Sequence, residues 1–247
     1  MPQSLDDIAA LLQPLGLILR GGFALDPEID ADLLRAYPQA RQLILIGNAG
    51  SAIWPQIAGF IAANPADQHP LDHWTAQTLA DIARRIDAIG LFPFGGPPWW
   101  PFQRWAQRVE SVHPSPLAIL IHPAFGLWHA YRAALLLAEP VELPVVAEQA
   151  SPCDGCADRP CLTTCPVGAF SLSGYDVERC AAHVNSASGD RCRRLGCLAR
   201  LACPVGVAWR YESDHAAFHM AAFQRAHPTD PLSEMVDPAD AASTASR

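Results

Sequence analysis

Two cysteine-rich stretches decide how this chain is organised. Residues 153–168 read CDGCADRPCLTTCPVG, residues 192–206 read CRRLGCLARLACPVG, and Cys180 lies between them. Together they account for all eight cysteines of the 247-residue chain. Thiolates are the ligands of iron–sulfur clusters, and a cubane cluster takes four of them. The cysteine count therefore predicts two [4Fe-4S] clusters with no thiol left over.

The spacing of the first stretch predicts how the cysteines are shared. It follows C-x2-C-x4-C-x3-C-P, close to the bacterial ferredoxin run C-x2-C-x2-C-x3-C-P, whose fourth cysteine ligates the other cluster. Both stretches end in Cys-Pro-Val-Gly, which indicates a pseudo-symmetric pair of half-sites. We assign one cluster to Cys153, Cys156, Cys161 and Cys203, and the other to Cys165, Cys180, Cys192 and Cys197.

Three alternatives to clusters stay open at this point. Four disulfides are disfavoured in a reducing compartment. Two structural zinc ions could use the same thiolates, but zinc does not account for the repeated Cys-Pro or the interleaved spacing. Unligated core cysteines are not expected at this density within one short segment.

The composition limits the partners and the location. The chain has no lysine and a formal net charge of -8, which argues against a general nucleic-acid binder because phosphates require a basic surface. The first residues, MPQSLDD, carry neither the positive region nor the apolar core of a secretory signal, so we expect a cytoplasmic protein. The longest apolar stretch, 117–138, is interrupted by Pro123 and Arg132 among others, which argues against a membrane span.

The cysteine-free half alternates strand-like and helix-like patterns, which predicts an α/β or α+β domain. We expect helices over a first segment capped by Ser4, over Asp72–Ile89 and over Leu127–Leu137. We expect strands over Leu15–Leu19, Gln42–Ile46 and Leu117–Ile121. A Gly/Pro/aromatic loop is expected over Phe92–Trp105.

The cysteine segment resembles a known arrangement. The pieces CPVGAF at 165–170 and DVERC at 176–180 are similar to the ferredoxin-like segment of epoxyqueuosine reductases and of corrinoid reductive dehalogenases. In those families the two-cluster domain follows a cobalamin-binding domain, and electrons pass from the clusters to the cobalt. The resemblance covers roughly residues 152–206.

A second stretch, IHPAFGLWHAYR at 121–132, resembles the His-Pro-x-Phe-Gly-x-Trp-x-x-x-Arg segment of cobalamin-processing proteins, which remove the upper ligand of the vitamin. The resemblance implies that Arg132 faces a ligand pocket, that the core is nitroreductase-like and α+β, and that the ligand is a cobalamin. Epoxyqueuosine reductases also carry an Asp proton donor upstream of this stretch, whereas Val112–Pro116 contains no carboxylate, which argues against that activity.

Five residues are candidates for cofactor binding: Arg132, His122, Trp128, His129 and Trp99. Four of them have a plainer alternative interpretation. Arg132 could belong to a structural ion pair, and the two histidines could be hydrogen-bonded core residues. Trp99 lies in the loop 94–102, which could form an aromatic wall over a large flat cofactor or could be a packed core loop.

These features predict a domain organisation and a function. We expect a nitroreductase-like α+β domain over 1–148 that binds a corrinoid, a small ferredoxin-like domain with two clusters over 149–227, and a flexible tail over 228–247. The chain would be an oxidoreductase that takes electrons from a ferredoxin or flavodoxin and passes them to a cobalamin. The alternative is a non-catalytic electron carrier whose N-terminal domain docks a partner enzyme.

Overall fold

The computed structural model describes residues 4–144 and 146–228 of the chain. It divides into two compact units, and each is discontinuous in sequence. The first unit comprises Met1–Arg159 and Cys203–Glu212, and the second comprises Pro160–Ala202 and Ser213–Arg247. The predicted tail over 228–247 lies outside the described residues except for residue 228. No described helix is long and apolar enough to cross a membrane.

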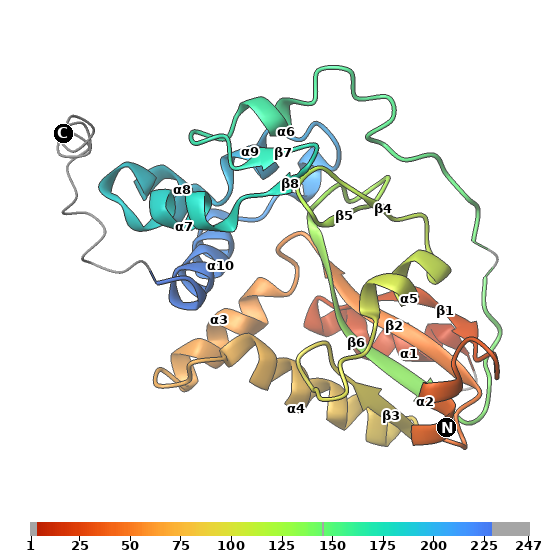
Figure 1. Ribbon diagram of the computed structural model, residues 1–247. Helices are drawn as coiled ribbons and strands as arrows, with labels where there is room; N and C mark the ends of the chain where they lie inside the picture. The colour runs from red at the N-terminus through yellow and green to blue at the C-terminus, as the bar shows by residue number, and fades with distance from the viewer. Residues whose placement is uncertain (1–3, 145, 229–247) are drawn as a thin grey trace, which may run out of the picture. The chain divides into compact units, whose positions relative to one another are not determined.

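A four-stranded sheet forms the centre of the first unit (Figure 1). Its order is β1 (Ile18–Ala24), β2 (Gln42–Ala49), β6 (His129–Leu137) and β3 (Ala88–Leu91). Every neighbouring pair is antiparallel. The strands therefore need no parallel crossover, and the unit is α+β.

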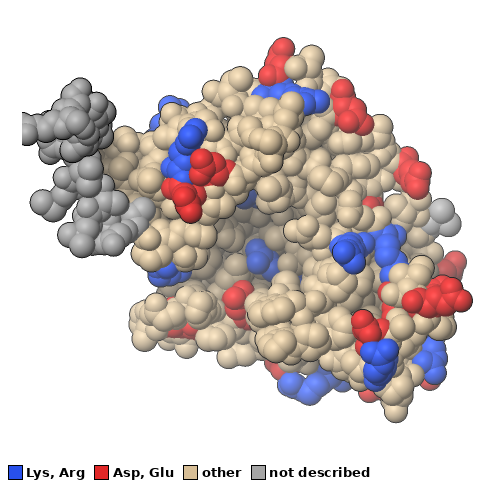
Figure 2. Space-filling view, viewed as in Figure 1, with Lys and Arg blue, Asp and Glu red and all other residues tan. Residues whose placement is uncertain are grey.

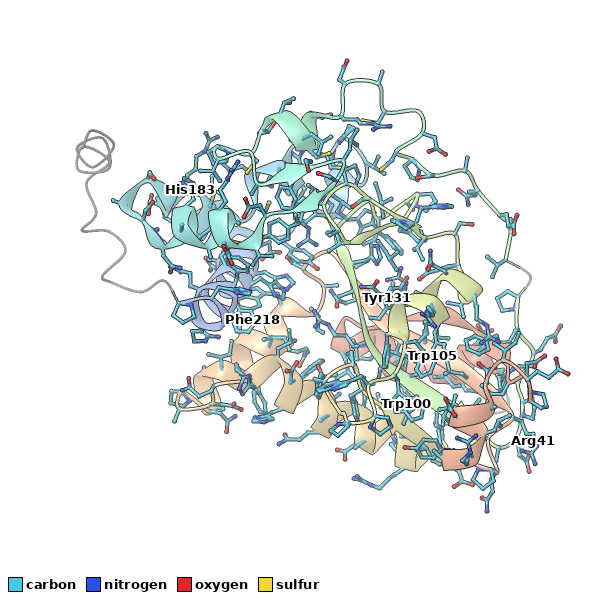
Figure 3. All side chains as sticks on the ribbon, viewed as in Figure 1. Arg41, Trp100, Trp105, Tyr131, His183 and Phe218 are labelled. Carbon is cyan, nitrogen blue, oxygen red and sulfur yellow. The ribbon has the colours of Figure 1, made fainter. Side chains whose placement is uncertain are left out.

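Helices cover both faces of this sheet. They are α1 (Leu5–Leu12), α2 (Ala31–Ala36), α3 (Trp54–Ala63), α4 (Pro70–Arg85) and α5 (Phe102–Val109). On β2, Ile44 and Ile46 join a core with α1, α3 and α4, whereas Leu43 and Leu45 join a second core with α2 and α5. The stacked pair Trp100 and Trp105, labelled in Figure 3, belongs to the second core. Because both faces are buried, the central strands carry continuously apolar runs, at residues 43–46 of β2 and 133–137 of β6.

This double burial explains the main error of the sequence analysis. Leu127–Leu137 was expected to be a helix, but residues 129–137 form the central strand β6, whose last five residues are all buried. A continuous apolar run has no period that separates a buried strand from a buried helix, and its alanines and leucines favour helix locally. Pairing with β2 and β3 overrides that preference.

Other boundaries are partly confirmed. The helix capped by Ser4 is α1, with a complete capping box, and the strand predicted at Gln42–Ile46 is β2. The strand predicted at Leu15–Leu19 begins and ends later, as β1. The helix predicted over Asp72–Ile89 ends at Arg85, and Ile89 lies in β3.

Two predicted segments near residue 100 also change. The loop predicted over Phe92–Trp105 is shorter, because α5 begins at Phe102. The strand predicted over Leu117–Ile121 is only β5 (Leu120–Ile121), which pairs with β4 (His113–Pro114) in a small hairpin. Both errors concern ends of elements, where local sequence is least decisive.

The second unit is mainly helical. Its elements are α6 (Pro160–Thr163), the hairpin β7 (Phe170–Ser171) and β8 (Gly174–Tyr175), α7 (Val177–Asn185), α8 (Asp190–Leu195), α9 (Leu198–Leu201) and α10 (Ser213–Ala226). Helix α10 packs against α7 and α8, and α6 packs against α9 and β7. This unit contains five of the eight cysteines, three of them within helices α6, α7 and α8.

Candidate functional site

The second unit brings four predicted cluster ligands together. Burial is the first cause that raises the pKa of Cys180, Cys192 and Cys197, and for Cys197 the pKa reaches about 11. The charge of Cys165 also raises the pKa of all three thiols, so the four sulfur atoms lie within electrostatic reach of one another. These four thiols repel one another when they are ionised, and the positive charge of an iron–sulfur core would offset that repulsion.

Backbone amides point at these sulfur atoms. The amide of Ala169 donates to Cys165 Sγ at 3.3 Å. Hydrogen bonding by the Leu198 backbone limits the rise in the pKa of Cys192, and hydrogen bonding by the Arg200 and Ala199 backbone limits the rise in the pKa of Cys197. These donors come from the two turns that follow the ligands, and they favour the thiolate that a cluster requires. The donor set therefore fits an iron–sulfur cluster.

Local structure fixes the ligand-bearing turns. Gly168, with φ of 59°, closes the turn after Cys165 by donating to that residue's carbonyl at 3.1 Å. Asp176 caps α7 by accepting from the Arg179 amide at 2.9 Å, and Cys180 lies in the following turn. Gly196, with φ of 87°, ends α8 between Cys192 and Cys197. The motifs CPVG and DVERC are therefore turn and cap signals as well as ligand signals.

The remaining predicted ligands are divided between the units. Cys153, Cys156 and Cys203 belong to the first unit, and Cys161 lies in α6 of the second. Burial raises the pKa of Cys203, with a further contribution from Cys156. Hydrogen bonding by the Val205 backbone limits that rise. Among the described residues, no three His, Cys, Asp or Glu side chains lie close enough together to hold a metal ion.

A buried polar cluster lies in the first unit, and we call it the Arg20 cluster: Arg20, Glu110, His122, His129 and Tyr131. The Arg20 guanidinium contacts Glu110 Oε1 at 2.7 Å, and its side chain is 1% exposed. Tyr131 donates to Glu110 Oε1 at 2.5 Å, and His122 Nε2 lies 3.4 Å from Oε2. Both terminal nitrogens of Arg20 lie 3.3 Å from His129 Nδ1. Figure 3 labels Tyr131 on β6.

The hydrogen bonds define the charge of each member. His122 Nδ1 accepts from the amides of Ala124 and Phe125, so its Nε2 is the donor to Glu110. Burial would raise the pKa of Glu110, but hydrogen bonding by His122 and the charge of Arg20 outweigh it, and the pKa is lowered. Burial, followed by the charge of Arg20, lowers the pKa of His129 to about 3. The cluster thus holds an ionised Arg–Glu pair and a neutral His129.

Arg132 occupies a different environment on β6. Its Nε donates to Asn48 Oδ1 at 2.9 Å, and burial lowers its pKa. Tyr211 and Asp72 interact with it electrostatically, but among the described residues no carboxylate lies within 4 Å of its guanidinium. Arg132 is therefore a half-buried cation without a close counter-ion, which is suited to an anionic ligand group.

Strand irregularities position both arginines. On β6 the register passes from Ala133 opposite Ile46 to Tyr131 opposite Gly47, so Arg132 is the extra residue of a bulge. On β1 the register between Leu19 and Gly22 also shifts, which places a second bulge at Arg20. Bulges re-aim side chains and are common next to functional sites.

The segment 203–212 returns to the first unit and packs on the stretch 125–128. A Cβ at Gly126 would lie 2.1 Å from the carbonyl oxygen of Val205, so the two backbones are in direct contact. The Trp209 ring lies 5.0 Å from the Phe125 ring, and Tyr211 lies 5.4 Å from Trp128. Phe125 in turn stacks on His122 at 4.4 Å. The loop after Cys203 thus contacts Phe125, which in turn contacts the Arg20 cluster.

The predicted cofactor residues are only partly brought together. His122 and His129 lie 5.9 Å apart in the Arg20 cluster, and Trp128 is buried beside Tyr211. Arg132 forms the separate cationic position described above. Trp99 is 68% exposed, and no ring contact or hydrogen bond between described residues links it to the other four. Its role therefore stays a prediction.

Several site residues were missed from sequence. Glu110 lies only two residues before the stretch that was inspected for a carboxylate, but its partner Arg20 is ninety positions away. A usable signal was Arg20 itself, a charge inside an apolar strand next to Gly21-Gly22, since a buried charge needs a partner. Glu110 also lines a cavity of about 430 Å³, together with Arg108, His113, Val146, Glu148 and Gln149 among others.

Comparison with known proteins shows which solved structures have a similar fold. Neither protein-family models nor curated proteins give a match. Among solved structures, epoxyqueuosine reductase from Streptococcus thermophilus matches with a TM-score of 0.51 and 14% identity, over 90% of this chain and 79% of that one. This likeness supports a shared fold, and it agrees with one of the two resemblances seen in the sequence.

Two further solved structures are similar at lower scores. An epoxyqueuosine reductase with a modified tRNA stem loop has a TM-score of 0.46 and 13% identity, over 84% of this chain and 65% of that one. The B12-trafficking protein CblC from C. elegans has a TM-score of 0.47 and 10% identity, over 89% and 95%. The expected absence of a nucleic-acid partner stays a prediction for this chain. Figure 2 shows Arg and acidic side chains interspersed on the viewed face.

Proposed function

We propose that this protein is an iron–sulfur reductase that delivers electrons to a corrinoid bound by its first unit. The mutual reach of the thiols Cys165, Cys180, Cys192 and Cys197 carries this proposal. When bound, two [4Fe-4S] clusters would supply single-electron transfer, and the corrinoid cobalt would accept the electrons. The donor would be a ferredoxin or flavodoxin, and reduction would accompany loss of the upper ligand of the cobalt.

The position of Cys203 supports a link between the thiols and the ligand site. Its loop contacts the Phe125–Gly126 backbone, and Phe125 stacks on His122 of the Arg20 cluster. The stretch around Phe125 would thus lie between Cys203 and a ligand bound beside this cluster. A short separation between an electron donor and its acceptor favours electron transfer.

The first unit offers specific contacts to such a ligand. Arg132, held by Asn48, would bind an anionic or amide edge. His122, His129 and Trp128 would form a wall of fixed dipoles and apolar surface, because their hydrogen bonds and packing leave little freedom. The exposed Trp99 would cover a flat ligand.

Anaerobic purification followed by iron and sulfide analysis tests the cluster part. We expect about eight irons per chain, four for each cluster, and an EPR signal of reduced [4Fe-4S] after reduction. Zinc in place of iron, or no metal at all, would contradict the proposal.

Incubation of the loaded protein with cyanocobalamin and a low-potential reductant tests the corrinoid part. We expect a change in the visible spectrum of the corrinoid and measurable binding, and Arg132→Gln should weaken that binding about tenfold or more. Arg35→Gln is the control, because Arg35 is exposed and forms an ion pair with the exposed Asp32. Clusters without any corrinoid binding would leave the electron-carrier alternative.

A further inference from the structure

We infer that His215 and His219 on α10 form a metal site of their own, which binds one divalent transition-metal ion such as Ni²⁺ or Zn²⁺. The two residues are four positions apart, so their side chains leave the same face of the helix one turn apart. The site lies within the second unit and uses none of the predicted cluster ligands. The inference therefore goes beyond the proposed function and does not depend on it.

The two imidazole rings meet through the nitrogen atoms that would bind the ion. His215 Nε2 lies 3.1 Å from His219 Nε2, and the ring centroids are 4.9 Å apart. Imidazole nitrogens bind zinc at about 2.0–2.1 Å, so two of them are about 3.3 Å apart on a tetrahedral ion and about 2.9 Å apart at right angles. The observed separation lies between these values, so one ion can bind both nitrogens with little movement of either ring.

The surrounding packing holds the pair in this position. His215 is 1% exposed, and the neighbouring Ala216 is also buried. Helix α10 packs against α7 and α8, and a Cβ at Gly196 would lie 3.1 Å from Ala216 Cβ. The His219 ring also contacts the ring of Phe218, labelled in Figure 3, at 5.5 Å. Because the rings are already ordered, binding an ion loses less side-chain entropy than it would for two exposed histidines.

The same two nitrogens can share either a proton or an ion. Without an ion, one Nε2 donates a hydrogen bond and the other accepts it. When an ion binds, the donor imidazole carries its proton on Nδ1 instead, and both Nε2 lone pairs bind the ion. Imidazole suits divalent zinc, nickel and copper, and helical histidine pairs four residues apart bind zinc in metalloproteases. His219 is only partly buried, so water can fill the remaining coordination positions.

Calorimetric titration of the anaerobically purified protein with NiCl₂, compared with His219→Gln, is the direct test. His219→Gln removes one ligand and keeps a polar side chain of similar size. The affinity of this site should fall at least about a hundredfold, because loss of a residue that only orients a ligand already costs about 10–100-fold. Thiols that bind Ni²⁺ are present in both proteins, so the difference between the two titrations reports the histidine site.

His227→Gln is the matched control, because His227 directly follows α10 and its ring contacts Phe223 rather than the pair. It should bind Ni²⁺ as the wild-type protein does. Equal stoichiometry and affinity for Ni²⁺ in the wild-type protein and in folded His219→Gln would overturn the inference.

Hydrogen exchange of the wild-type protein, with and without Ni²⁺, keeps the test decisive if His219→Gln does not fold. An ion bound to both histidines ties two successive turns of α10 together, so the backbone amides of residues 215–222 should exchange more slowly. Unchanged exchange in α10 at saturating Ni²⁺ would overturn the inference without any variant.

Discussion

The tetrapeptide Cys-Pro-Val-Gly occurs twice in this chain, and its two copies have different surroundings. Both end in a glycine of left-handed conformation, with φ of 59° at Gly168 and 69° at Gly206. A Cβ at Gly168 would meet nothing within 4 Å, whereas a Cβ at Gly206 would lie 2.3 Å from the backbone of Phe125. The same local sequence therefore ends in the same left-handed glycine, but only the second glycine is also a packing surface.

The difference shows what each turn contributes. The turn at Gly168 directs backbone amides toward Cys165 and continues into the hairpin that holds Tyr175. The turn at Gly206 brings the segment after Cys203 against the stretch 125–128. The Arg20 cluster holds that stretch through His122, which accepts a hydrogen bond from the Phe125 amide. Disturbing the Arg20 cluster should therefore affect the second turn and spare the first.

Glu110→Gln should give the largest effect. It leaves Arg20 buried without a counter-charge, and loss of one partner of a buried ion pair costs about 3–5 kcal/mol. Urea denaturation followed by tryptophan fluorescence measures the loss, because all seven tryptophans lie in the first unit. Asp32→Asn, which removes the exposed partner of Arg35, is the control and should cost about 1 kcal/mol or less. Equal effects of the two substitutions would mean that the Arg20 cluster does not support this region.

Gly206→Ala should come next and compares the two turns directly. We expect a loss of about 2–5 kcal/mol in the tryptophan-detected transition, from about 1–2 kcal/mol for the left-handed backbone and about 1–3 kcal/mol for overpacking. Gly168→Ala has the same backbone strain without the clash, and the second unit contains no tryptophan. It should leave that transition unchanged and cost about 1–2 kcal/mol when unfolding is followed by circular dichroism. A silent Gly206→Ala would remove the distinction between the turns.

The smallest effect concerns pH. The pKa of His129 is about 3 in the folded protein and about 6.5 when unfolded, so between these values the unfolded state binds more protons. The stability from keeping His129 neutral is present above about pH 6.5 and is lost as pH falls, at about 1.4 kcal/mol per unit.

His129→Gln should therefore reduce the loss of stability between pH 7 and pH 5 by about 2 kcal/mol. Urea denaturation at both pH values, again followed by tryptophan fluorescence, measures this difference. Tyr37→Phe is the control, because a tyrosine does not titrate in this range. A pH dependence identical to that of the wild-type protein would show that His129 does not remain neutral in the fold.

The sequence alone determined the local features of the protein. The Ser4 capping box, the buried strand from Gln42 and the two Cys-Pro-Val-Gly turns depend on neighbouring residues, so their patterns were readable. The number and types of possible cluster ligands were also fixed by the cysteines themselves, since thiol chemistry does not depend on the fold. Their partition between two clusters stays a prediction.

Only the tertiary structure decided the rest. Residues 129–137 became a strand because β2 and β3 supply hydrogen bonds and both faces are covered, which no local pattern records. The contact of Arg20 with Glu110 spans ninety positions, and the aim of Arg132 depends on a bulge in the pairing of two distant strands. Burial and charge pairing are properties of the packed chain, so the polar site became visible only when those segments met.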